Sequence, residues 1–315
     1  MIRKINVLQE ECSGIVIDFK GLEAIYWTIK LGSITAAAEK LNTTQPAMSA
    51  RVIQVEAEFG TKLFDRSNRT VIPTSVGRDV AAYAERMLQM RSEMLYSVAD
   101  KFRISGNFRL GLGETIAHTW LPELVDKISD HYPKLTLEID VDTAAYLRER
   151  LLHQKLDLAF FIGSTDSQSV IKRSLCDFSI RFFVSPGLAE SSGKNVFDYF
   201  STYPVMTYAR MTQPYASVSA LLSDPLFISP TLHASSSIAV VIKMAIAGMG
   251  IAAIPRDLVL DKLADGSLVE LDTPFSLPAL SFNAFWRSGP DDHLPRKIFE
   301  LASSVVETSV ASQHF

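Results

Sequence analysis

The sequence predicts an α/β protein with an all-α-rich N-terminal part and a larger C-terminal part that forms two α/β lobes. Three observations support this fold class. Apolar residues recur every three or four positions through residues 19–59, which is the spacing of short amphipathic helices. Residues 75–102 contain no proline and continue that spacing, as one long helix does. From residue 105 onward, short apolar runs alternate with amphipathic segments, the order expected of a chain of 315 residues that builds βαβ units.

The first two predicted helices are short. One begins at Phe19, and its apolar positions fall three or four residues apart as far as Ile29. Thr35 is the predicted N-cap of the next, an alanine-rich helix that ends near Leu41. Residues 42–44, Asn-Thr-Thr, then form a turn, because their side-chain oxygens compete well for backbone donors.

The third predicted helix follows this turn. Thr44 is its N-cap, and Gln45 and Pro46 occupy its first turn, where a proline costs little. One face is apolar and comprises Met48, Val52, Val55 and Phe59. The opposite face is small and polar and comprises Pro46, Ala47, Ala50 and Gln54, with Ser49 and Arg51 at its flanks. Such a face is either simply solvated or lets the backbone approach another surface, and two helices joined by a short turn form a helix-turn-helix.

A short hairpin follows the helix-turn-helix. The chain alternates at Leu63 and Phe64 and returns through residues 71–73, with Arg66 and Arg69 near the tip. Two arginines on a projecting wing suit contact with the phosphates of a nucleic acid. The hairpin therefore favours duplex DNA as a partner over a face that is merely solvated. Thr74 is the predicted N-cap of the next helix.

A larger set of residues recurs in order and at fixed spacing through residues 19–103: Phe19, Gly32, Ser33, Ala36, Ala37, Leu41, Gln45, Pro46, Ala47, Ser49, Glu56, Gly60, Leu63, Phe64, Arg66, Thr74 and Gly77. With this set, the segment resembles the DNA-binding half of a LysR-type transcriptional regulator. Val55 and Phe59 replace leucines that are usual in the family, and both keep the stripe apolar. The resemblance implies four segments: an extension (1–18), a winged helix-turn-helix domain (19–74), a dimerisation or linker helix (75–104) and an effector-binding domain (105–315).

The long predicted helix carries two apolar stripes. One stripe is enough to pack a helix onto its own domain, so the second predicts a partner helix and hence a coiled-coil-like homodimer. The first stripe comprises Ala81, Ala84, Leu88, Arg91, Leu95, Val98 and Phe102. The second comprises Val80, Tyr83, Met87, Met90 and Met94. Ser105, Gly106 and Asn107 then indicate a hinge.

The C-terminal part predicts two βαβ lobes, each with a mostly parallel sheet. Its landmarks resemble the two-lobed, periplasmic-binding-protein-like (type 2) effector domain of the same regulators: Leu121-Pro122, the Ala-Gly-Met-Gly-Ile run from residue 247, and Ile254-Pro255. The predicted strands are Phe108–Gly113, Leu135–Val141, Asp157–Ile162, Pro204–Tyr208, Thr231–His233, Ile251–Ile254 and Phe282–Trp286, the last returning toward the first lobe. The predicted helices are Ile116–His131, Ala144–Gln154, a segment with Ile238 and Val241, and Pro295–Val310.

Candidate effector-binding residues follow the ends of the predicted strands, where open α/β sheets bind ligands. The first group is Gly113, Glu114, Thr115 and Ile116. The second is His233, Ser235 and Ser236, within the run 233–237 (His-Ala-Ser-Ser-Ser) that opens the next predicted helix. The alternative is that Thr115 and the serines only cap their helices. Glu114 either complements its own helix or binds a cationic group of the effector. Further candidates are Thr143, Phe161, Gly163 and Tyr208, the last being either a stacking platform or a core tyrosine.

Charge, cysteine content and the motifs present limit the possible classes of function. The formal net charge is −4, yet residues 19–103 carry twelve Lys and Arg against nine Asp and Glu, so the basic part is the one that resembles a DNA-binding domain. Neither a membrane span nor a signal peptide is predicted, and two cysteines indicate a reducing compartment, so a cytoplasmic protein is expected. The six scattered histidines and the absence of phosphate-binding or nucleophile motifs predict no catalytic residue, metal or cofactor. A lone effector-domain cysteine, Cys176, is expected to be buried and inert.

Together these features predict a sequence-specific regulator that binds DNA and is switched by a small organic acid or amino acid. The residues expected to contact DNA are Thr35, Thr44, Gln45, Pro46, Ser49, Arg51, Arg66 and Arg69. The expected partners are double-stranded promoter DNA, the effector and a second copy of the chain, with a tetramer and RNA polymerase as further candidates. The alternative function is a solute-binding or catalytic α/β protein whose N-terminal domain serves assembly.

Overall fold

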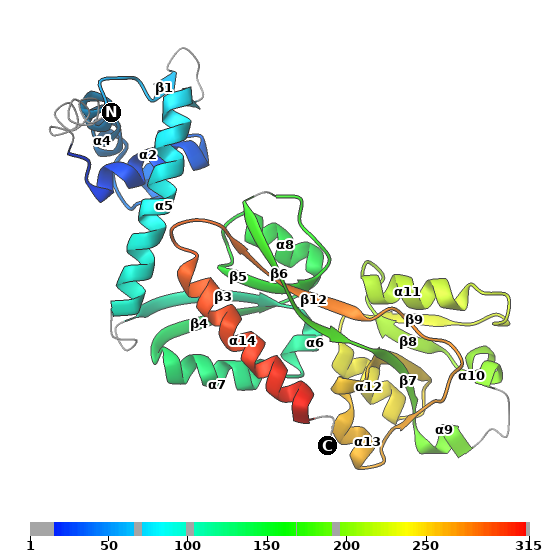
Figure 1. Ribbon diagram of the computed structural model, residues 1–315. Helices are drawn as coiled ribbons and strands as arrows, with labels where there is room; N and C mark the ends of the chain where they lie inside the picture. Colours follow the sequence, from blue (N-terminus) through cyan, green and yellow to red (C-terminus); the bar gives the residue numbers. More distant parts are fainter. Residues whose placement is uncertain (1–15, 66–70, 99–103, 168, 191–195, 313–315) are drawn as a thin grey trace, which may run out of the picture. The chain divides into compact units, whose positions relative to one another are not determined.

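The computed structural model describes residues 16–65, 71–98, 104–167, 169–190 and 196–312 (Figure 1). The chain forms two compact units. The first comprises Met1–Ala99 with Gly289–His293, and the second comprises Asp100–Ser288 with Leu294–Phe315.

Three helices make up the helix-turn-helix region of the first unit: α2 (Phe19–Leu31), α3 (Ile34–Lys40) and α4 (Gln45–Glu58). The cap of α4 is confirmed, because the Thr44 hydroxyl accepts a hydrogen bond from the Ala47 amide at 3.4 Å. The predicted cap of α3 is wrong. Ser33 has the extended backbone and accepts from the Ala36 amide, whereas Thr35 lies inside the helix. Both residues can cap, and the chain uses the earlier one.

The core of the first unit is built from the stripes that the spacing predicts. Leu22 and Tyr26 of α2 are buried against Met48, Val52 and Val55 of α4. Asn42, in the turn between α3 and α4, adopts a left-handed backbone with φ of 47°, a conformation that asparagine tolerates better than most residues. The local chemistry of the turn and the apolar stripe therefore suffice to place α4.

The predicted wing is confirmed as a two-stranded antiparallel hairpin. Strand β1 (Phe64–Asp65) pairs with β2 (Ile72–Pro73), and the Thr74 hydroxyl accepts from the Gly77 amide to cap the following helix. Gly77 has a steric reason to be glycine, since a Cβ there would lie 2.1 Å from the Leu63 carbonyl oxygen. The long helix α5 (Ser75–Val98) thus begins in backbone contact with the wing.

A buried carboxylate ties the wing to α4. Glu56 lies on α4, and one of its oxygens accepts from the amides of Leu63 and Phe64 at 3.0 and 3.3 Å. The other oxygen lies 2.9 Å from the Lys62 ammonium. Burial tends to raise the pKa of Glu56, but these hydrogen bonds outweigh it and hold the pKa below its ordinary value of 4.5.

We expect Glu56→Ala to lower the free energy of unfolding of the first unit by about 2–4 kcal/mol, because two buried amides lose their acceptor. Since the folded pKa is depressed, the contribution of Glu56 is fully present above pH 4.5 and is lost as the pH falls through the folded value. Urea unfolding, monitored by hydrogen exchange at the Leu63 and Phe64 amides and repeated across this pH range, measures both the loss of free energy and its dependence on pH. Glu58→Ala is the control, since Glu58 accepts only an exposed bond from the Val16 amide among the bonds described. Equal stability of the Glu56 variant and wild type at pH 7 would contradict the assignment.

Helix α5 presents one buried and one exposed apolar face. Ala84 and Leu88 are buried against the first unit, and Arg91 pairs with Glu23 at 2.8 Å. Val80 is buried too, so its assignment to the second stripe, the one expected to contact a partner helix, is wrong. The remaining members of that stripe are exposed, and we call them the α5 stripe: Tyr83, Met87, Met90 and Met94. Phe102 lies outside the described residues.

The second unit contains two five-stranded sheets. The first has the order β4 (Lys134–Val141), β3 (Ser105–Leu112), β5 (Leu158–Ile162), β12 (Leu280–Arg287) and β6 (Val170–Phe178). The second has the order β11 (Val269–Glu270), β7 (Ile180–Val184), β10 (Ile251–Pro255), β8 (Val205–Tyr208) and β9 (Leu232–Ser235). In each sheet two of the four pairings are parallel and two antiparallel, so the prediction of mostly parallel sheets is wrong.

The antiparallel pairings arise because the chain crosses between the lobes. Strand β6 of the first sheet leads into β7 of the second with only Ser179 between them. Strand β12 returns and pairs with β5 and β6, which confirms that this segment comes back to the first lobe (Figure 1). A strand that arrives from the other lobe has no crossover helix, so it enters antiparallel to its neighbours.

Helices cover both faces of each sheet. In the first lobe, α7 (Leu121–His131) and α14 (His293–Ser312) pack on one face and α8 (Ala144–Leu152) on the other. In the second lobe, α11 (Gln213–Leu222) and α12 (Ile238–Ile246) pack on opposite faces. The remaining helices are α6 (Glu114–Ala117), α9 (Pro186–Glu190), α10 (Val196–Thr202), η2 (Arg256–Leu258) and α13 (Leu260–Ala264).

The single helix predicted over Ile116–His131 is two helices, α6 and α7. The break lies at Thr119 and Trp120, and Pro122 occupies the first turn of α7. Proline lacks the amide hydrogen that a helix interior requires, but the first turn makes no use of it. Because of the break, α6 is a short separate helix that follows the end of β3 and lies next to the second lobe.

Candidate functional site

The outer face of α4 is accessible along its length. Gln45, Pro46, Ala50 and Gln54 are exposed, while Ala47, Ser49 and Arg51 are half-buried. Thr44, the N-cap of α4, and Thr35, in the first turn of α3, are exposed as well. Ile53, which the sequence reasoning did not single out, belongs to the same face and is 48% exposed. With two alanines on it, this face allows the α4 backbone to approach a partner closely. Arg66 and Arg69 lie outside the described residues.

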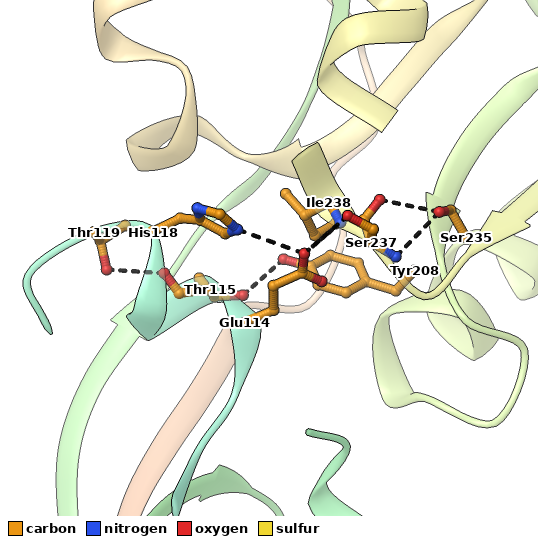
Figure 2. Close-up of polar contacts among 8 residues, drawn as sticks. All are labelled: Glu114, Thr115, His118, Thr119, Tyr208, Ser235, Ser237 and Ile238. Atoms are coloured by element: carbon orange, nitrogen blue, oxygen red, sulfur yellow. Dashed lines mark hydrogen bonds and ion pairs between the residues drawn. The ribbon is translucent and has the colours of Figure 1, made fainter. Parts of the chain in front are cut away.

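Glu114 joins the two lobes (Figure 2). Its carboxylate extends from α6 in the first lobe to the N-terminus of α12 in the second. The oxygen Oε1 accepts a hydrogen bond from the Ile238 amide at 2.8 Å and one from the Ser237 hydroxyl at 3.3 Å. The His118 ring nitrogen Nε2 lies 3.5 Å from the same oxygen. Glu114 therefore complements a helix of the other lobe as well as lying in the first turn of its own.

Thr115 makes a second contact between the lobes. Its hydroxyl lies 2.8 Å from the hydroxyl of Tyr208, the last residue of β8, and its backbone carbonyl accepts from the Thr119 hydroxyl. Burial raises the pKa of Tyr208 above its ordinary value of 10.0, against the opposing effect of the Thr115 hydrogen bond. Tyr208 is thus neutral at physiological pH. The capping alternative for Thr115 is wrong, because Gly113 is the N-cap of α6 and Thr115 lies within the helix.

The second predicted group divides between a strand and a bend. Ser235 ends β9 beside Tyr208, and its hydroxyl accepts from the Ser237 amide at 3.1 Å. His233 is an exposed residue of β9, and Ser236 is exposed in the bend before α12. Strand β9 therefore extends two residues past its predicted end at His233, so Ser235 lies in the strand and not in the turn that opens the helix. The N-cap is Ser237, which the candidate residues did not include.

The remaining candidates lie at strand ends of the first lobe. Thr143 is exposed at the N-cap of α8, and its hydroxyl donates to Asp142. Gly163 follows β5 with φ of 109°, a conformation that favours glycine. Ile116 is buried in the core. Phe161 is buried as well, stacked on Phe285 at 4.0 Å between ring centroids, so its side chain is a core element and does not line the junction of the lobes.

Ser237 closes the predicted run before the helix, whereas Ile238 was expected only as a helix residue and its place at the junction was missed. A signal for them exists, because a serine directly before the apolar run of α12 is a common N-cap pattern. His118 and Thr119 carry no such signal, since their roles depend on where α6 ends. What the arrangement offers is a set of hydroxyls and backbone amides around one carboxylate.

The described residues give little support to a reactive thiol or a metal site. Cys176 is partly buried, and burial raises its thiol pKa to about 12, which disfavours the reactive thiolate. Within the described ranges, no group of three or more His, Cys, Asp or Glu side chains could hold a metal ion. No helix in the described part of the chain is long and apolar enough to cross a membrane.

Comparisons with known proteins agree with this architecture. Residues 19–78 match the family model of the bacterial regulatory helix-turn-helix protein of the lysR family, and residues 103–304 match the LysR substrate binding domain. The chain is 24% identical over 243 residues to the transcriptional regulator SoxR of Arthrobacter sp. strain TE1826, covering 77% of this chain and 81% of that protein. It is 25% identical over 248 residues to GltR of Bacillus subtilis, covering 78% and 82%.

A solved structure shares the fold. Full-length LysG of Corynebacterium glutamicum, with bound effector Arg, superposes with a TM-score of 0.57 at 15% identity, covering 92% of this chain and 98% of that one. At this identity the likeness concerns the fold alone. The two family models together span most of the sequence, and the chain therefore belongs to the LysR family of transcriptional regulators.

Proposed function

We propose that this regulator binds specific duplex DNA as a homodimer and that a small organic acid or amino acid, bound between the two lobes, controls that binding. The observation that carries the DNA proposal is the outer face of α4. Its small and polar side chains are accessible while the opposite stripe is buried. A helix with such a face can lie in the major groove, where its N-terminal residues reach the base edges.

The proposed contacts follow from position on α4. Gln45, Pro46 and Ser49 lie in the first turns and would approach base edges or the adjacent backbone. Arg51 would reach a base edge or a phosphate, and Thr35 and Thr44 lie where they can contact phosphates. Arg66 and Arg69, in the wing, would bind phosphates and so act on all sequences alike.

The α5 stripe supports the dimer. Its large apolar side chains are exposed on a helix whose other face is already packed, and such a surface is removed from water when two copies pair. A second interface on the lobes would extend the dimer to a tetramer, and RNA polymerase is a further proposed partner. Transcriptional control places the protein in the cytoplasm.

The junction of the lobes supports the effector proposal. The backbone amides of Glu114 and Thr115 have no hydrogen-bond acceptor in the described part of the chain, and the hydroxyls of Thr115, Tyr208 and Ser237 lie close by. Amides and hydroxyls of this kind bind carboxylates and other polar groups. The structure of LysG carries arginine as effector, which supports an amino acid as one of the two classes.

A gel shift with the full chain tests the proposal. Duplex from upstream of its own gene should be retarded at lower protein concentration than a scrambled duplex, and the affinity should fall as salt rises. Thermal shift of the full chain against small carboxylates and amino acids should then find a ligand that raises the melting temperature and alters the gel shift. Folded protein that binds neither duplex at low salt would reject the DNA-binding function and leave the solute-binding alternative.

A further inference from the structure

Helix α12 receives its N-terminal cap from the other lobe. Ser237 is its N-cap residue, yet the Ser237 side chain makes no capping hydrogen bond to the helix. The first amide of α12, on Ile238, donates instead to the Glu114 carboxylate, which comes from α6. The Ser237 hydroxyl donates to the same oxygen (Figure 2). The group that usually caps a helix locally has been replaced by an anion from 124 positions away in the sequence.

The replacement of a local cap by the Glu114 carboxylate has an electrostatic reason. The N-terminus of a helix carries unpaired amides and a partial positive charge, so a carboxylate adds a charge interaction that a neutral hydroxyl lacks. The position at Ile238 is therefore one that an anionic group of a ligand would occupy in a domain that binds its ligand between two lobes. In this chain the protein itself supplies the anion.

A second contact beside the first shows that the two lobes are held together at this point. Thr115, the neighbour of Glu114, is 1% exposed and shares a 2.8 Å hydrogen bond with Tyr208 of the second lobe. Tyr208 pairs in register with Ser235, and the Ser235 hydroxyl holds the Ser237 amide. Two consecutive residues of α6 thus contact the end of β8 and the start of α12, the two elements that border the junction.

We propose that Glu114 is a tethered carboxylate that joins α6 to the second lobe, a contact we call the clasp, and that it competes with any anionic effector for the N-terminus of α12. An effector carboxylate has to displace Glu114, because two carboxylates cannot share the Ile238 amide without strong repulsion. Displacement frees α6 from α12, so binding is coupled to a change in how the lobes are joined. The part that concerns the effector rests on the proposed function, whereas the clasp itself does not.

Hydrogen exchange in the full chain tests the clasp without effector or DNA. Glu114→Ala should speed exchange at the Ile238 amide about tenfold or more, the factor expected when a hydrogen bond to a charged group is lost. Tyr208→Phe removes only the hydroxyl and should speed exchange of the same amide by a smaller factor. Glu123→Ala is the matched control, because Glu123 lies in α7 and pairs with Lys127 on the surface. Unchanged exchange at Ile238 in Glu114→Ala would overturn the clasp.

Acetate tests the carboxylate position directly. Sodium acetate, compared with sodium chloride at equal ionic strength, should restore protection of the Ile238 amide in Glu114→Ala and leave the wild type and Glu123→Ala unchanged. Glu114→Gln keeps the size of the side chain and serves if the alanine variant does not fold; it too should respond to acetate. No acetate response in either Glu114 variant would overturn the competition. An intact clasp in a protein that shifts no DNA and binds no ligand would reject the proposed function alone.

Discussion

Replacing Ala50 with glutamate should abolish specific DNA binding. Ala50 is exposed at the middle of the outer face of α4, so the new carboxylate would point toward base edges and phosphates in both copies of a dimer. A disrupted base contact costs about 1–3 kcal/mol, so two copies should lose about 2–6 kcal/mol, roughly 30-fold or more in affinity. Fluorescence anisotropy with duplex from upstream of the gene measures the loss.

The same substitution elsewhere is the control for charge and composition. Ala145 is exposed on α8 of the second unit, and Ala145→Glu should bind DNA as the wild type does. Both variants should melt at the wild-type temperature, because exposed substitutions of this kind change stability by about 0.5 kcal/mol or less. If Ala50→Glu bound specific duplex with wild-type affinity, α4 would not be the reading helix.

The second large effect is expected from the α5 stripe. Met87 and Met90 are exposed, the latter to 69%, and changing both to glutamate would place four carboxylates in one apolar seam of a dimer. Burying a methionine side chain contributes about 1.5–3 kcal/mol, and a buried unpaired charge costs more. The oligomer should therefore lose half its mass, to 34.9 kDa where the wild type is a dimer.

Light scattering coupled to gel filtration reads this mass. Met211→Glu with Met249→Glu is the matched control, because both methionines are exposed in the second unit and neither belongs to α5. The control should keep the wild-type mass. The Met87 and Met90 variant should also lose specific DNA binding, since a monomer has a single helix-turn-helix domain and contacts only one half-site. An unchanged mass in that variant would show that the stripe is not the dimer interface.

The parts of the fold that local chemistry decides could be predicted from the sequence. The turn at Asn42, the cap at Thr44 and the stripe of α4 depend on neighbours within a few residues, and the structure confirms them. Where two local signals competed, the prediction failed: Ser33 and Thr35 are both capping residues. The break before α7 was missed although Pro122 signals it, because the apolar spacing continues across Trp120.

The junction of the lobes depends on contacts that no local pattern contains. The position of Glu114 directly after a strand could be predicted, because the apolar run of that strand precedes it in the sequence. That Glu114 bonds to Ile238 could not, since the two meet only when β12 and β6 have joined the lobes. Phe161 was misassigned because a strand buried on both faces shows no alternation that tells which side its ring takes.

Site-specific photo-cross-linking tests most directly whether the outer faces of two α4 helices contact one DNA duplex. A photoreactive residue at position 50 should cross-link to two clusters of bases. The clusters should be separated by about 10 base pairs or a multiple of that, because the two helix-turn-helix domains of a dimer bind two half-sites. The same residue at position 145 should give no cross-link. Complexes that form normally but cross-link from position 145 and not from position 50 would contradict the account.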